Sequence, residues 1–135
     1  MAHYLQSLPS TESPRGDTAR SAPARLERGA KVYEAQCARC HGDDGKGVVR
    51  AYVPLAGNRA VLLESPAHLV QVVLGGAFAP STAGNPRPFG MPPFATELGD
   101  EDVAAVLSYI RNAWGNRAAA VHAIDVQRWR SSVRP

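Results

Sequence analysis

Two cysteines and the histidine after them restrict the fold more than any other feature of the sequence. They form the run Cys37-Ala38-Arg39-Cys40-His41, and the chain contains no other cysteine. Two thiols at this spacing can each bond one vinyl group of the same porphyrin, which is the attachment pattern of c-type haem. The next residue then lies beneath the ring, where its imidazole can bind iron. The run therefore predicts one covalent haem c, attached at Cys37 and Cys40 and ligated by His41.

A redox-active thiol pair and a zinc site are the alternative interpretations of this run. A Cys-x-x-Cys redox pair usually follows a strand in a βαβ unit, and the sequence shows no such context. A zinc site needs two further ligands, and the remaining histidines are scattered without metal-ligand spacing. These histidines are His3, His68 and His122. We therefore favour haem attachment over both alternatives.

Hydrophobic periodicity predicts a helical protein. Apolar residues at helical spacing cover 24–37, 66–74 and 101–114, and a weaker pattern covers 124–132. No alternating pattern long enough for a strand is present. We therefore expect an all-α fold.

Residues that favour helix ends flank two of these helices. Ser65 and Asp100 are N-cap candidates, and Pro66 suits the first helical position. Gly75 suits the C-terminal end of the second helix. These residues predict helices that begin after positions 65 and 100.

The connecting segments 42–64 and 76–99 are unusually long for loops in a domain of this size. Loops of this length need an internal scaffold, and the predicted haem supplies one. The chain of 135 residues fits a single domain. We place it at 24–115, after a linker at 1–23 rich in proline and small polar residues, and before a C-terminal extension at 116–135.

The terminal segments and the charge exclude several functions. The first residues lack the basic start and apolar stretch of a signal peptide, and no apolar run is long enough for a direct membrane span. The net charge of +3 comes mainly from arginines in the extension, while the central body is close to neutral. No basic stripe with interleaved aromatic residues predicts nucleic-acid binding. The extension is interpreted as a solvated end, with docking to an acidic partner as the alternative.

Met91 is the best candidate for a second iron ligand. It stands in Phe89-Gly90-Met91-Pro92-Pro93-Phe94, where proline and glycine favour an extended strap that can present a thioether to the haem. A lone methionine often only fills a gap in a core, which is the alternative. His68 is expected to face away from the apolar stripe of its helix. The remaining candidates lie near the chain ends: Met1, His3 and His122.

In combination these motifs resemble a class I cytochrome c. The resemblance covers about 24–115 and rests on the Cys37–His41 run and on three further segments. These are Pro54-Leu55-Ala56-Gly57-Asn58, Gly90-Met91-Pro92 and Val106-Leu107-Ser108-Tyr109-Ile110-Arg111. It implies three to five helices wrapped around one haem, with crossing N- and C-terminal helices. Gly29 and Tyr33 would then meet Tyr109.

The resemblance also implies a haem pocket. A carbonyl in the Val53–Pro54 turn is expected to accept a hydrogen bond from the His41 ring, and His41 and Met91 are the expected metal ligands. An apolar shell is expected from Leu55, Leu69, Val73, Phe89, Phe94 and Leu107. Hydrogen-bond donors to the haem propionates or the strap are expected from Tyr52, Asn58, Arg59 and Trp114.

The chain ends resemble a narrower group, the multihaem cytochrome c subunits of periplasmic alcohol, gluconate and aldehyde-type dehydrogenases. Tyr4–Pro9 is similar to the final helix of a preceding cytochrome domain, and Trp114-Gly115-Asn116, Val121 and Asp125-Val126 are similar to their last domain. The resemblance implies a periplasmic location, with a larger parent protein that can hold the domain at the membrane. It also implies a dehydrogenase as electron donor and an oxidase, a quinone-linked protein or another cytochrome as respiratory acceptor.

The expected function is one-electron transfer, without catalytic residues, because two axial ligands leave no iron position for a substrate. Electrons are expected to pass at the haem edge framed by Ala38, Arg39, Pro54 and Pro92. Two alternatives stay open. A labile Met91 would allow a haem enzyme or a gas-binding sensor, and a redox-inert haem would be a structural scaffold.

Overall fold

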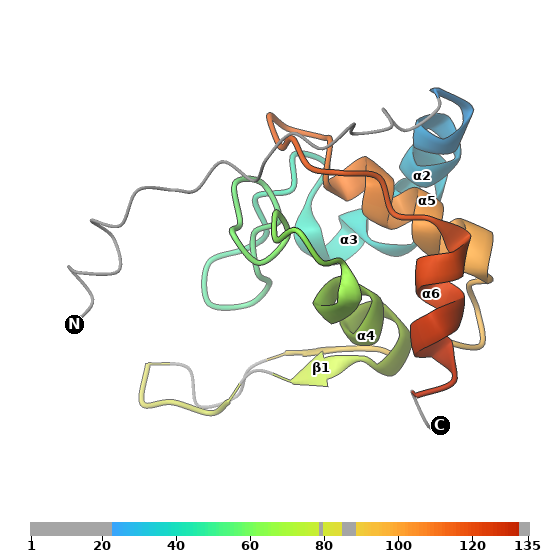
Figure 1. Ribbon diagram of the computed structural model, residues 1–135. Coiled ribbons are helices and arrows are strands. Elements are labelled where there is room, and N and C mark those ends of the chain that lie inside the picture. The colour runs from blue at the N-terminus through green and yellow to red at the C-terminus, as the bar shows by residue number, and fades with distance from the viewer. Residues whose placement is uncertain (1–22, 79, 85–88, 133–135) are drawn as a thin grey trace.

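The computed structural model describes residues 23–78, 80–84 and 89–132. Within these ranges the chain forms five helices, and the loop at 42–64 lies to one side of them (Figure 1). The helices are α2 (Pro23–Gln36), α3 (Ala38–His41), α4 (Ala67–Gly75), α5 (Asp100–Ile110) and α6 (Ala123–Arg130). The proposed end of a preceding domain, Tyr4–Pro9, and almost all of the linker at 1–23 lie outside the described residues.

Helices α2 and α5 cross at a glycine, as the resemblance to class I cytochromes implied. Gly29 is buried, and a Cβ atom at this position would lie 2.1 Å from the Ala105 carbonyl oxygen. The rings of Tyr33 and Tyr109 pack beside the crossing, with their centroids 5.4 Å apart. Glycine is needed here because any side chain would hold the two backbones apart.

Helix α5 is the centre of the hydrophobic core. Seven of its eleven residues are buried. A helix that is apolar on most of its surface is stable only when it is buried, so α5 forms the inner element of the fold. Val106 and Leu107 belong to the same buried cluster as Val70 and Leu74 of α4. The apolar stripe predicted for 66–74 therefore faces the core.

The helix ends differ slightly from the predicted ones. Helix α5 begins at Asp100, one residue early, and Gly99 takes the N-cap position. It ends at Ile110 rather than near 114, because Trp114 and Gly115 adopt positive φ angles of 54° and 85°, which stop a helix. Helix α4 begins at Ala67, whose N–H lies 3.3 Å from the hydroxyl of the predicted cap Ser65.

The predicted all-α class is confirmed, and the described residues add only a short antiparallel sheet of two strands, β1 (Ala77–Phe78) and β2 (Gly90–Met91). Ala77 pairs with Met91, and Phe78 pairs with Gly90. Two residues are too few to produce an alternating pattern, so these strands have no signal in the sequence. The sheet ties the strap that carries Met91 to the segment that leaves α4.

The C-terminal segment packs on the core, so its interpretation as a solvated end was wrong for the described residues. Helix α6 lies against α5 and α4 (Figure 1), and Val121 and Val126 are fully buried. The Ser108 hydroxyl donates to the Val121 carbonyl at 3.1 Å and accepts from its N–H at 2.9 Å. Arg130 forms a 2.6 Å salt bridge with Asp100.

The predicted fourth helix is confirmed, at Ala123–Arg130. No helix in the described ranges is long and apolar enough to cross a membrane.

Candidate haem site

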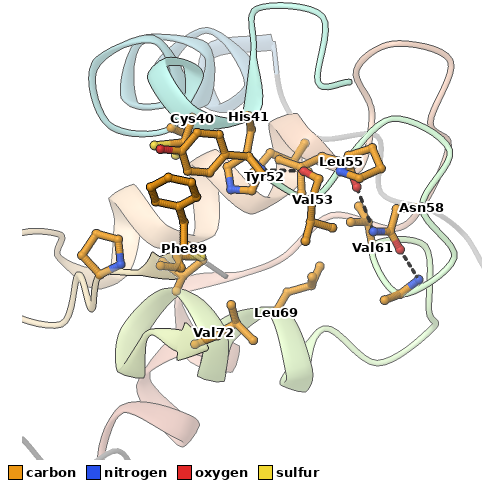
Figure 2. Close-up of a pocket in the computed structure, with 18 of the residues that line it drawn as sticks. Cys40, His41, Tyr52, Val53, Leu55, Asn58, Val61, Leu69, Val72 and Phe89 are labelled. Carbon is orange, nitrogen blue, oxygen red and sulfur yellow. Dashed lines mark hydrogen bonds between the residues drawn. The ribbon is translucent and has the colours of Figure 1, made fainter. Parts of the chain in front are cut away.

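A largely apolar cavity of about 710 Å³ lies between the α3 turn and the 42–64 loop on one side and α4 with the Met91 strap on the other. Figure 2 shows Cys40 and His41 on one side of this cavity, and Leu69 and Val72 of α4 on the opposite side. A volume of this size lies within the usual range for cofactor pockets. The predicted site residues that line it are Cys37, Cys40, His41, Tyr52, Val53, Pro54, Leu55, Asn58, Leu69, Val73, Phe89, Met91 and Phe94.

The cysteines lie on the tight turn that joins α2 to α3. The Cys37 N–H donates to the Tyr33 carbonyl at 2.8 Å, and the His41 N–H donates to the Cys37 carbonyl at 3.0 Å. Both thiols are free and face the cavity. Burial, followed by the nearby Cys40 thiol, raises the pKa of Cys37 to about 11, so this thiol is protonated at neutral pH. The turn thus presents two thiols to the same cavity as the imidazole.

The His41 ring is fixed by the backbone of the next loop. Its Nδ1 lies 2.8 Å from the Val53 carbonyl oxygen. Because a carbonyl oxygen only accepts, Nδ1 must donate, so Nε2 is the ring nitrogen that remains to bind a metal. A carbonyl partner also raises the basicity of the imidazole. This is the hydrogen bond that the resemblance implied, and Val53 provides it.

Met91 lines the same cavity from a strap that lies beside the C-terminal end of α4. Its strand pairing with Ala77 fixes one side of the strap, and the Phe94 N–H donates to the Val73 carbonyl at 2.9 Å farther along. Gly76 makes the close approach possible, since its φ is 75° and a Cβ there would lie 2.7 Å from the Met91 carbonyl oxygen. A thioether, an imidazole and two thiols therefore line one apolar cavity, and this donor set fits haem c.

The comparison with protein families agrees with this geometry. A family model described as Cytochrome c matches residues 26–114. The chain belongs to the cytochrome c family. As a member of this family it is an electron-transfer domain that carries a c-type haem, and it is not itself an enzyme.

The curated relatives include subunits of dehydrogenases and a small cytochrome. The "Alcohol dehydrogenase (quinone), cytochrome c subunit" of Gluconobacter oxydans (strain 621H) is 37% identical over 99% of this chain and 30% of its own length. The "Gluconate 2-dehydrogenase cytochrome c subunit" of Pantoea cypripedii is 38% identical over 74% of this chain and 23% of its own length. "Cytochrome c-552" of Thermus thermophilus is 38% identical over 65% of this chain and 69% of its own length. The chain thus covers less than a third of the length of either dehydrogenase subunit.

Trp114 does not take the role expected for it in this cytochrome domain. Its indole Nε1 donates to the Asp43 carbonyl at 2.9 Å, and its ring covers Gly45, where a Cβ would lie 2.4 Å from a ring atom. It is also absent from the cavity lining. The residue therefore fixes the loop after His41 instead of donating to a haem propionate or the strap.

The predicted donors Asn58 and Arg59 lie in different surroundings. Asn58 lines the cavity, where its amide nitrogen donates to the Pro54 carbonyl at 2.8 Å and its oxygen accepts from the Ala60 N–H at 2.9 Å. Arg59 is exposed and does not line the cavity, whereas the next residue, Ala60, does. Their donation to a haem propionate stays a prediction. His68, expected on the surface, is exposed but also contributes to the cavity wall.

Two buried polar residues that hold the cavity loops were not predicted from the sequence. The Asn116 amide nitrogen donates to the Leu55 and Ile110 carbonyls, at 3.1 and 2.9 Å, and its oxygen accepts from the Gly57 N–H at 2.8 Å. Arg111 is 1% exposed, and its guanidinium donates to three backbone carbonyls in two other segments. These belong to Val61, Leu63 and Ala119, at 2.8, 2.7 and 2.9 Å.

The burial of Arg111 also lowers the pKa of its guanidinium. A signal for this residue existed in the sequence, because Arg111 follows Leu107 by four positions and so continues the apolar stripe of α5. A charged residue in such a stripe is buried only when hydrogen-bond acceptors surround it. The sequence could not show where those acceptors come from.

Proposed function

We propose that this domain transfers single electrons through one haem c whose iron is held by His41 and Met91. When bound, haem c supplies a one-electron ferric/ferrous couple. The observation that supports the proposal is the single cavity that His41, Met91 and the two cysteines all line. With both axial positions taken by protein, the domain offers no iron site to a substrate.

The protein walls favour electron transfer because they are apolar and hold both ligands in place. Val53 fixes the His41 ring, and β1 and Val73 fix the Met91 strap. Ligands fixed in this way change position little when the iron changes charge, which keeps reorganisation small. The apolar lining excludes water and so shifts the reduction potential. A thioether ligand raises the potential relative to a second histidine.

The electron donor is proposed to be a dehydrogenase partner, because the relatives include cytochrome c subunits of two dehydrogenases. The acceptor is then an oxidase, a quinone-linked protein or another cytochrome of a respiratory chain. Arg39, Pro54 and Pro92 are exposed beside the cavity and mark the edge at which electrons would pass. Among the described lining residues the charged side chains are Lys46 and Arg50, with no carboxylate, which favours acidic docking surfaces on the partners.

The same relatives support a periplasmic location, since haem c is attached outside the cytoplasm in the group that the sequence resembles. The chain covers about a third of the length of the alcohol dehydrogenase subunit. A longer parent protein that carries further haems and holds the domain at the membrane is therefore part of the proposal.

The experiment begins with protein produced together with the haem attachment machinery. Its mass should exceed that of the bare polypeptide by one haem, and the pyridine haemochrome spectrum should show two thioether bonds. The ferric protein should show the weak far-red absorption band of methionine ligation, and the reduced protein should not bind carbon monoxide rapidly at neutral pH. Met91→His should abolish the far-red band and lower the potential, while the control His68→Gln should preserve both. A band that survives Met91→His, or rapid binding of carbon monoxide by the unmodified protein, would refute the ligation.

A further inference from the structure

Two aromatic rings meet across the edge of the haem cavity. Tyr52, from the 42–64 loop, and Phe89, from the strap segment, have ring centroids 5.3 Å apart at an interplanar angle of 35°. Both residues line the cavity. Figure 2 shows the Phe89 ring pointing from its own side of the cavity toward the ring of Tyr52, close to Cys40. The pair therefore connects the two walls that carry the proposed iron ligands.

Each ring is close in sequence to one of these ligands or its support. Tyr52 directly precedes Val53, whose carbonyl holds the His41 ring. Its backbone is fixed by two hydrogen bonds with Val48, at 3.0 and 2.9 Å. Phe89 precedes Met91 by two positions. A continuous path thus leads from the His41 support, through the ring contact, to the Met91 strap.

The strap needs such a contact because its other attachments are short. Strands β1 and β2 have two residues each, and the Phe94–Val73 hydrogen bond lies beyond the two prolines that follow Met91. Phe89 is 60% exposed, so simple burial in the core does not explain its position. Segments with few buried contacts open locally at low cost in free energy. The ring contact opposes this opening on the N-terminal side of Met91.

We propose that Tyr52 and Phe89 form an aromatic clasp that holds the Met91 strap closed over the haem. They are positioning residues, because they act on the iron through Met91. The clasp sets how readily Met91 leaves the iron and an external base replaces it. This inference rests on the proposed ligation by His41 and Met91.

The test measures imidazole binding to the ferric holoprotein, followed by the loss of the far-red band. Phe89→Ala and Tyr52→Ala should each bind imidazole about two- to tenfold more tightly, which corresponds to the roughly 0.5–1.5 kcal/mol of an aromatic pair. Tyr52→Phe keeps the ring and should bind like the unmodified protein. Leu63→Ala, on the same loop, 52% exposed and outside the cavity lining, is the control and should also leave the affinity unchanged.

The double variant decides whether the rings act as one unit. A clasp predicts that Phe89→Ala combined with Tyr52→Ala gains no more affinity than either single variant, because the first change already removes the contact. Multiplied effects, an effect of Tyr52→Phe equal to that of Tyr52→Ala, or an equal gain in Leu63→Ala would overturn the clasp. In the same holoproteins the free energy of unfolding, obtained from the unfolding midpoint, should fall by much less than the free energy of imidazole binding gains. A fall of equal size would show general loosening of the protein instead. A far-red band absent from the unmodified protein would overturn the ligation itself, whereas a normal band with unchanged imidazole binding in both alanine variants overturns the clasp alone.

Discussion

Gly29→Ala is the most direct test of the crossing between α2 and α5. A methyl group at this position would lie 2.1 Å from the Ala105 carbonyl oxygen and 2.7 Å from the Tyr109 Cβ. Both atoms belong to the rigid part of α5, so no flexible side chain can move aside. The contact is more than an ångström closer than ordinary van der Waals distance. The two helices must therefore separate, which loosens the packing of Tyr33 against Tyr109.

The net effect is the difference between two opposing contributions. Overpacking of a well-packed interface costs about 1–3 kcal/mol, and a backbone neighbour places this site near the upper limit. Alanine in a helix interior is about 1 kcal/mol more favourable than glycine. We therefore expect the free energy of unfolding to fall by about 1–2 kcal/mol, which lowers the melting temperature by roughly 4–8 °C in a domain of this size.

Thermal and guanidinium unfolding of the holoprotein, followed by far-ultraviolet circular dichroism, provides the measurement. Lys31 supplies a matched control because it lies in the same helix and is exposed. Both Lys31→Ala and Lys31→Gly remove its contact with Glu27, so their difference gives the intrinsic preference of α2 for alanine. Alanine should be more stable than glycine at position 31 and less stable at position 29. If alanine is preferred at both positions, the close crossing is refuted.

Substitutions at three further residues test the buried polar contacts by urea unfolding of the holoprotein. Tyr33→Phe removes the 2.6 Å hydrogen bond from its hydroxyl to the Gly42 carbonyl and should cost about 1 kcal/mol. Burial raises the pKa of Tyr33, so the contribution of its neutral hydroxyl to the free energy of unfolding is complete below the unfolded pKa of about 10 and is lost as the pH rises above that value. Tyr33→Phe should therefore reduce the loss of stability in alkali. An unchanged alkaline profile would contradict this. Arg111→Met should cost about 3 kcal/mol or more because it leaves three backbone carbonyls without a donor. Arg111→Lys should recover only part of this loss, since an ammonium group lacks the forked geometry of a guanidinium. Full recovery would show that charge alone matters. Asn116→Asp should be at least as destabilising as Asn116→Ala, about 2 kcal/mol, because it places a carboxylate against two carbonyls; a milder effect of Asp would contradict the assigned amide orientation.

The haem-site motif and the helices were predictable because their signals are local in sequence. The spacing of Cys37, Cys40 and His41 is set by one turn of backbone, so three adjacent side chains carry the chemistry. The helices follow from periodic burial against a single core. The contact of Gly29 with α5 was predictable for a similar reason, since glycine in a helix interior has a cost that close packing offsets.

The departures from prediction arise where a side chain finds its partner far away in the sequence. Trp114 is able to donate a hydrogen bond, and its residue type alone suited a haem propionate. The fold gives the Trp114 indole to the Asp43 carbonyl. The two-residue sheet is similarly nonlocal, because Ala77 and Met91 pair across a long connection. Such choices depend on tertiary geometry and leave no periodic pattern.

One element, the C-terminal end of α5, links the helix crossing to the haem cavity. The helix packs on α2 through Ala105, and directly beyond it Arg111 binds the carbonyls of residues 61 and 63. Asn116 then binds the 55–57 turn, and Trp114 binds the loop after His41. The loop 42–64 is therefore held in place by side chains from residues 111–116. A domain boundary at 115 would separate Asn116 from this arrangement, and the buried Val121 and Val126 extend it further. The packing thus favours a folding unit that continues through α6, in which residues 116–130 help to hold the cavity loops and the core instead of only following the domain.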